Sequence, residues 1–163
     1  MNAREAIKLS INGGQMITLE YLADLSDEEM LHRPHPSCNH IKWQVGHLIS
    51  SEHQMIDAVC PGSMPALPDG FASRYTNETA MSDDPASFDS KADLRKLFDE
   101  QRSATLRALS SLTDSDLDDP APEAMQEYAP TVGDVFSLQS GHWMMHAGQW
   151  AVIRRQLGRP PLF

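Results

Sequence analysis

The sequence contains only two cysteines, Cys38 and Cys60. A helix is predicted between them, and a rise of about 1.5 Å per residue would hold them about 30 Å apart. A disulfide needs Cα atoms within about 7 Å of each other, so we expect no internal disulfide. Neither cysteine belongs to a Cys-x-x-Cys motif. Both are expected to be inert apolar residues, and a reducing cytoplasm is the expected location.

Basic residues are also few: 13 Lys and Arg stand against 23 Asp and Glu, which gives a formal net charge of −10. Nucleic-acid phosphates and anionic membrane surfaces attract positive charge, so we expect neither as a partner. Residues 1–6 lack the apolar core of a signal peptide, so none is expected. With 40% hydrophobic residues, the chain is expected to form one domain over residues 1–163.

One stretch, residues 135–153, carries no formal charge and is long enough to cross a bilayer. It also contains polar side chains, which are costly in lipid. We therefore expect a buried helix with a functional role here, rather than a membrane span. The polar residues that decide this are Gln139, Ser140, His142, His146 and Gln149.

Apolar residues recur at intervals of three and four in four stretches, the pattern of amphipathic helices. The predicted helices cover about 3–25, 39–59, 90–112 and 131–157, with N-caps at Asn39, Ser90 and Thr131. Gly158, followed closely by two prolines, should end the last helix. The predicted fold class is all-α, a four-helix bundle with a long crossover connection between the second and third helices.

Two glycines, Gly13 and Gly14, interrupt the first helix at a cost of about 1 kcal/mol each against alanine. They either let another helix approach closely or are a tolerated weak point. The connection 61–89 is rich in proline and glycine, and such long connections are usually functional or mobile. It is expected to lie across the bundle and to shape the mouth of a site, pinned by Leu67, Phe71 and Tyr75.

Two short segments, residues 25–30 and 112–117, resemble each other. Each follows a long predicted helix, carries the Ser/Thr-x-x-acid spacing of a capping box and precedes a helix that contains histidine. The chain therefore resembles two helix pairs, unless two common caps coincide by chance. In a repeated arrangement the second and fourth helices can face each other.

His142 and His146 lie four residues apart in the predicted fourth helix, which places both rings on one face. Such a pair can bind a divalent metal, although a pair of ordinary surface or core histidines is the commoner explanation of this spacing alone. His47, in the second helix, is the best candidate for a third ligand. His40 lies about 10 Å from His47 along the helix axis, which is too far for the two to share a metal ion. His53 points in a different direction from His47.

Three segments together point to a known family. They are Leu25-Ser26-Asp27-Glu28-Glu29 with Arg33-Pro34, Ile41-x-Trp43-x-x-Gly46-His47-Leu48, and His142-x-x-x-His146-Ala147-Gly148-Gln149 running into Arg154-Arg155-x-Leu157-Gly158. With them, nearly the whole chain resembles the DinB-like family, which includes the YfiT-like proteins.

The resemblance implies a four-helix bundle, often dimeric, in which one histidine of the second helix and two of the fourth bind a divalent metal. These positions correspond to His47, His142 and His146. Zinc or nickel is the most expected metal, with iron an option. Characterised members include transferases and isomerases that use low-molecular-weight thiols such as bacillithiol, mycothiol or glutathione. Many others have no assigned reaction.

Three neutral imidazoles leave a metal with an open position, as in catalytic zinc sites, where a thiol would ionise or water would become a nucleophile. Two function classes stay open. The first is a metal-dependent enzyme acting on a small molecule, either a thiol transferase or a hydrolase. The second is a stress-related metal- or ligand-binding protein without turnover. A deep pocket over the metal would favour the enzyme, and a capped metal would favour the binding protein.

The remaining candidate residues lie on the same two helices. No glutamate follows His142, so the His-Glu-x-x-His motif of metalloproteases is absent. Glu52 and Gln149 are each a candidate general base, a hydrogen-bonding partner of a ligand or a plain surface group. A homodimer is expected from the resemblance. One face of the fourth helix would either form its interface or pack within the bundle: Trp143, Ala147 and Trp150.

Overall fold

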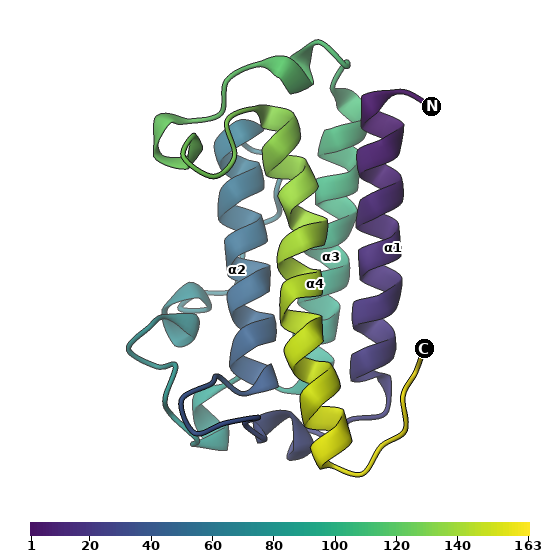
Figure 1. Cartoon of the computed structure of the whole chain (residues 1–163). Coiled ribbons are helices and arrows are strands. Elements are labelled where there is room, and N and C mark those ends of the chain that lie inside the picture. Colours follow the sequence, from purple (N-terminus) through teal and green to yellow (C-terminus); the bar gives the residue numbers. More distant parts are fainter.

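Four long helices make up the protein in a computed structural model that describes all 163 residues (Figure 1). They are α1 (Ala3–Ala23), α2 (Ile41–Val59), α3 (Lys91–Ser111) and α4 (Val132–Gln156), with no strand. The predicted all-α bundle is confirmed, as are the N-caps of α3 and α4 at Ser90 and Thr131. None of the helices combines the length and the apolar character that spanning a membrane requires.

The helices are arranged so that α1 contacts α4 and α3, while α2 contacts the same two helices from the opposite corner. The Lys91 ammonium, at the start of α3, donates to the Ala23 carbonyl at the end of α1. The Arg154 guanidinium, near the end of α4, donates to the Tyr21 carbonyl. Hence α1 runs parallel to α4 and antiparallel to α3 (Figure 1). Because α2 and α3 are also parallel, the chain must return along the whole bundle between them.

The two similar segments form equivalent turns at opposite ends of the bundle. In the first, the Ser26 and Glu29 side chains each accept the other's backbone N–H. Thr113 and Asp116 form the same reciprocal pair in the second. The predicted repeat is therefore visible in the structure, and α2 and α4 contact each other as expected. The two helices of each pair, however, lie diagonally across the bundle rather than side by side.

The buried face of α4 differs in part from the one that its apolar pattern predicts. Trp143, Ala147 and Trp150 lie within the bundle, each at most 2% exposed, because they pack between α4 and its neighbours. They cannot form the exposed stripe considered for a dimer interface, although dimerisation itself stays a prediction. The apolar spacing along this helix predicts an inward face that contains Val135, Met145, Val152 and Ile153. Val135 and Ile153 are buried, whereas Met145 and Val152 are 60% and 49% exposed.

The crossover between α2 and α3 is anchored by aromatic side chains, as predicted. Phe71 and Tyr75 are buried, and Leu67 packs against the core at its edge. The Tyr75 hydroxyl donates to the Asp89 carboxylate at 2.7 Å. The Tyr75 ring lies directly on Gly46 of α2, where a Cβ would overlap the ring carbons. Glycine at position 46 is thus what allows the crossover to pack this closely on α2.

The glycine pair of α1 has two different roles. A Cβ at Gly14 would lie 2.8 Å from Oγ of Ser140, which itself donates to the Ser10 carbonyl. Gly14 therefore permits the close approach of α4, which is one of the two interpretations that the sequence offers for the glycine pair. Gly13 has no such neighbour within 4 Å and is the tolerated weak point.

The start of α2 corrects the sequence-based assignment. His40, not Asn39, is the N-cap, and its Nδ1 accepts the Trp43 backbone N–H at 3.1 Å. Its Nε2 lies 3.2 Å from the Ser82 carbonyl, to which it donates. An asparagine is the commoner N-cap, so this choice depends on the crossover, which supplies the second partner of the His40 ring.

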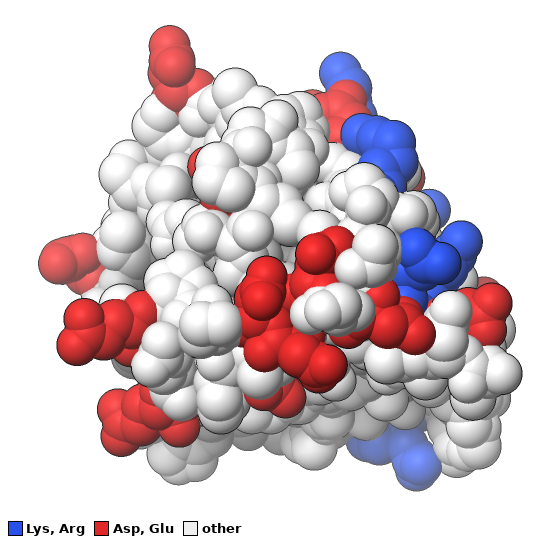
Figure 2. Space-filling view, turned by 90° about the horizontal axis from the view of Figure 1, so that it is seen from above, with Lys and Arg blue, Asp and Glu red and all other residues white.

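One end of the bundle is visibly acidic. Seen from above, along the bundle from the end where α1 begins, acidic side chains gather near the centre and basic ones lie along one edge (Figure 2). This distribution follows the net charge of −10. A polyanion approaching this end would meet like charge.

Replacing Gly46 by alanine is expected to lower the free energy of unfolding by about 1–3 kcal/mol, because the Tyr75 ring must leave its place. The matched control is Gly13→Ala, also inside a helix but with open space around it. It should raise stability by about 0.5–1 kcal/mol through helix propensity. Urea unfolding followed by circular dichroism measures both. Equal effects in the two variants would contradict the packing assigned to Tyr75.

The His40 cap should make stability depend on pH. Burial, with the nearby Arg33 charge, lowers the pKa of His40 from 6.5 to about 4. The unfolded chain therefore binds more protons between these values, so stability falls as pH drops from 6.5 to 4. In His40→Asn this fall should be smaller by about 2 kcal/mol. Urea unfolding across this pH range, with exposed His35→Asn as control, tests it. Parallel curves for His40→Asn and wild type would refute the assignment.

Candidate metal centre

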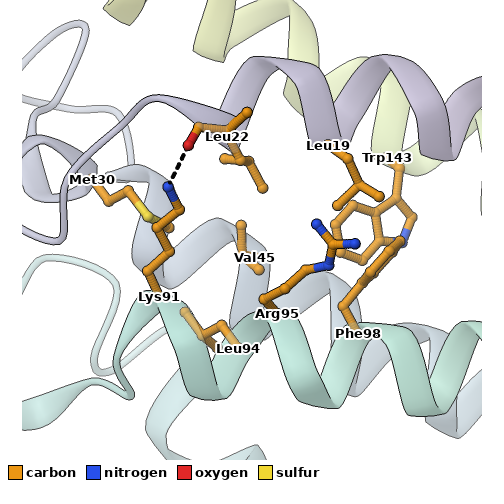
Figure 3. Close-up of a pocket in the computed structure, with 10 residues that line it drawn as sticks. Leu19, Leu22, Met30, Val45, Lys91, Leu94, Arg95, Phe98 and Trp143 are labelled. Atoms are coloured by element: carbon orange, nitrogen blue, oxygen red, sulfur yellow. Dashed lines mark hydrogen bonds between the residues drawn. The ribbon is translucent and has the colours of Figure 1, made fainter.

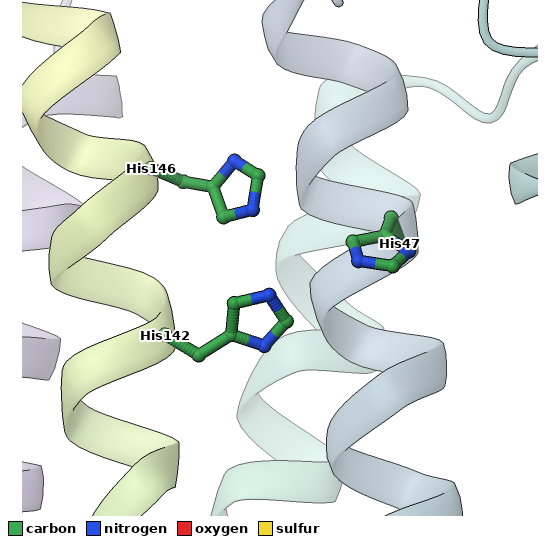
Figure 4. A group of neighbouring side chains, drawn as sticks. All are labelled: His47, His142 and His146. Carbon is green, nitrogen blue, oxygen red and sulfur yellow. The ribbon is translucent and has the colours of Figure 1, made fainter. Parts of the chain in front are cut away.

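Three histidine rings meet between α2 and α4 (Figure 4). His47 comes from the middle of α2, and His142 and His146 are one turn apart on α4. Ligand nitrogens from all three residues lie within 4.8 Å of one another. The three residues predicted from sequence are therefore brought together, because α2 and α4 are antiparallel neighbours. The cluster contains no carboxylate.

The cluster suits one divalent ion. Zinc–nitrogen bonds of about 2.0–2.1 Å place tetrahedral ligands about 3.4 Å apart, so modest rotations of the side chains would close these rings on an ion. His146 is buried, whereas His47 and His142 are half-buried. Two of the three rings therefore border solvent, and a small molecule can approach from that side. That these residues bind a metal remains a prediction.

Gln44 fixes the protonation of the His146 ring. The Trp150 indole N–H, which can only donate, donates to Oε1 of Gln44 at 2.7 Å. The same oxygen lies 2.9 Å from Nδ1 of His146, so this nitrogen must carry a proton and donate as well. The lone pair of His146 is then on Nε2, free for a metal. Hydrogen bonds of this kind orient ligand rings and increase their basicity.

The Trp43 ring supports the His47 ring by stacking on it. The two rings are stacked with centroids 4.9 Å apart and an interplanar angle of 6°. The Trp43 indole N–H donates to the Thr76 carbonyl at 3.1 Å and to the Thr79 hydroxyl at 3.2 Å. Both acceptors belong to the crossover. The crossover therefore positions His47 through Trp43, a role that the sequence alone did not reveal.

All three histidines are held in the neutral form that metal binding requires. Burial, together with neighbouring imidazoles, lowers the pKa of His142 and of His146 to about 4. Burial also lowers the pKa of His47. At neutral pH the rings therefore have lone pairs available without loss of a proton.

The two residues considered as a general base are both engaged elsewhere. Glu52 is 1% exposed, and its carboxylate accepts from the Thr105 hydroxyl, the Arg102 guanidinium and the Trp143 indole. Gln149 accepts from Nε2 of Gln44, so it supports the residue that orients His146. Glu52 is thus a structural carboxylate, and Gln149 acts two hydrogen bonds away from a ligand.

Histidines outside the cluster have their own partners. His53 points away toward α3, as predicted, where its Nδ1 lies 3.1 Å from Oε1 of Gln101. Both cysteines are free and half-buried, so the predicted absence of a disulfide is confirmed.

An apolar cavity of about 270 Å³ is lined by none of the three histidines. This cavity therefore does not lie over the cluster.

Replacing Gln44 by leucine should weaken zinc binding by about 10–100-fold, because the His146 ring loses the acceptor that fixes its tautomer. Competition with a chromogenic chelator measures the affinity. Gln101→Leu is the matched control, since this buried glutamine makes the same contact to His53, which is not in the cluster. An equal loss of affinity in both variants would show that the effect comes from general destabilisation.

Comparison with known proteins identifies the family of the chain. The sequence matches the DinB superfamily over residues 11–150, well over half of the chain. The matched span contains His47, His142 and His146 and all of α2 and α3. No curated protein matches the chain. The resemblance noted in the sequence is thereby confirmed at the level of the family.

Proposed function

The chain belongs to the DinB superfamily, and we propose that it is a metal-dependent enzyme which attaches a low-molecular-weight thiol to an electrophilic small molecule. The observation that carries the proposal is the group of three neutral imidazoles with no carboxylate among them. His47, His142 and His146 would hold one divalent ion, zinc or nickel in the first place, with iron as a further option. A metal held in this way keeps an open position at which a thiol loses its proton at neutral pH.

The protein's own residues would prepare this site in three ways. Gln44 keeps the proton of His146 on Nδ1 and leaves Nε2 for the metal. Trp43 holds the His47 ring by stacking. The half-buried His47 and His142 border the solvent side, where the thiol and its electrophile would enter. The thiolate sulfur would form the new S–C bond as the bond from that carbon to its leaving group breaks. The leaving group would depart as an anion, and the thiol proton would pass to solvent.

One observation favours a second candidate, a metal- or ligand-holding protein without turnover. Glu52, the nearest candidate base in the sequence, uses both carboxylate oxygens in the core and is not free to move protons. A thiol transferase does not need such a base, because the metal itself lowers the thiol pKa. A hydrolase acting through metal-activated water is a further alternative within the enzyme class.

The proposal extends to partners and location. A reducing cytoplasm supplies low-molecular-weight thiols, and the two free cysteines suit it. A homodimer is part of the proposal on family grounds, with light scattering at micromolar concentration as its measurement. The acidic charge supports a small-molecule substrate rather than nucleic acid or an anionic membrane.

The test combines metal analysis with a panel of thiols and electrophiles. Wild-type protein should retain about one zinc or nickel per chain after gel filtration, and His47→Ala, His142→Ala and His146→Ala should each lose it. Conjugation should vanish with the metal. His53→Ala and the double variant Cys38→Ser/Cys60→Ser should keep both properties, because these residues lie outside the cluster.

Three outcomes separate the alternatives. Conjugation that survives His142→Ala but disappears with the cysteines would refute the proposed mechanism. Hydrolysis of an ester or amide without conjugation would indicate that the site activates water and that the protein is a hydrolase. Tight metal binding with no reaction across the panel would favour the binding protein.

A further inference from the structure

An apolar cavity of about 270 Å³ enters the bundle between α1 and α3 (Figure 3). Eight of its ten lining residues are hydrophobic. Val45 of α2 and Trp143 of α4 reach it from the far side, and most of the others belong to α1 and α3. The histidine cluster lies between the other two helices, so the cavity is a separate feature. The apolar lining residues are Leu19, Leu22, Ala23, Met30, Val45, Leu94, Phe98 and Trp143.

Packing defects do not explain a space of this size. Protein interiors are close-packed, and voids larger than a water molecule are few because their walls lose dispersion contacts. Small-molecule pockets begin at about 300 Å³ and are mainly apolar with a few placed polar groups. The cavity is close to that range. It also has a specific polar feature, since its only two non-hydrophobic lining residues, Lys91 and Arg95, are both cationic.

The two cations lie on one side of the cavity, on successive turns of α3. The Lys91 ammonium donates to the carbonyls of Ala23 and Leu25, which leaves one of its three protons free. The Arg95 guanidinium donates to Asp99 through Nε only, and its two terminal nitrogens donate to no protein atom. Figure 3 shows this guanidinium extending across the cavity toward Leu19 and Trp143. Donors are therefore available beside an apolar interior.

We propose that this cavity binds an amphipathic carboxylate, such as a medium-chain fatty acid, with its alkyl chain against Phe98 and Trp143 and its carboxylate at Arg95 and Lys91. An apolar chain restores the contacts that the empty cavity lacks. A carboxylate accepts two hydrogen bonds from a guanidinium, which an alcohol or a cationic head group cannot do. The proposal does not depend on the metal site, because no histidine of the cluster lines the cavity.

Isothermal titration of metal-free protein with hexanoate, octanoate and decanoate tests the alkyl site. Each methylene that enters should tighten binding by about fourfold until the cavity is full. His47→Ala should bind decanoate as the wild type does, which separates this site from the metal centre. Leu94→Phe and Leu19→Trp fill the cavity from two helices and should each weaken binding by tenfold or more. Leu94 is buried and Leu19 is half-buried. Leu19→Trp is therefore expected to fold even if Leu94→Phe does not.

The head-group contact is tested by Arg95→Gln, with Arg107→Gln as the matched control on the exposed surface of the same helix. Arg95→Gln should lose the preference for decanoate over decanol, a change of about tenfold in relative affinity, whereas Arg107→Gln should keep it. A bromine at the end of the alkyl chain should quench tryptophan fluorescence through contact with Trp143. Lack of saturable binding at millimolar decanoate would overturn the proposal. Unchanged binding by both filled variants, or equal affinity for decanoate and a decyl trimethylammonium ion, would do the same.

Discussion

The side-chain amide of Gln44 joins the two helices that carry the histidines. Its oxygen accepts from His146 and Trp150 of α4, and its nitrogen donates to Gln149 of α4 and to the Asn39 carbonyl before α2. All of its hydrogen-bonding capacity is used at a position with no solvent exposure. A buried polar group with any partner missing costs about 1–3 kcal/mol, so this amide favours one register of α2 against α4. The same register places His47 opposite His142 and His146.

A buried charge pair lies in the same bundle core. Arg102 of α3 and Glu52 of α2 are 2.8 Å apart and almost fully buried, and the Trp143 indole of α4 donates to the same carboxylate oxygen. The Arg102 guanidinium also lies over the faces of Phe98 and Trp143, which stabilise a cation. Trp143 thus contacts the charge pair and the apolar cavity, and it directly follows His142 in the chain. Removing one partner of such a pair costs about 3–5 kcal/mol, which makes these three helices depend on one another.

The helix directions explain why the crossover reaches the histidines. Since α2 and α3 are parallel, the chain between them returns along the full length of the bundle. It packs on α2 through Tyr75 against Gly46, and it supplies the acceptors for the Trp43 indole. His47 is held against Trp43 by stacking. A long connection is therefore part of the site in this topology, because it supports a ligand ring that neither α2 nor α4 supports alone.

His47 was assigned to the cluster through the internal repeat and the family resemblance. The sequence by itself determined the four helices, the capped starts of α3 and α4, and the placement of His142 and His146 on one face. These follow from local rules, because caps act within one turn and the spacing of His142 and His146 is set by the helix itself. Only the tertiary structure decided which face of α4 is inside, that His40 rather than Asn39 caps α2, and that Glu52 pairs with Arg102. Each of these outcomes depends on a partner from a distant segment. Helical periodicity tells which residues share a face, whereas hydrogen bonds and packing between helices decide what that face contacts.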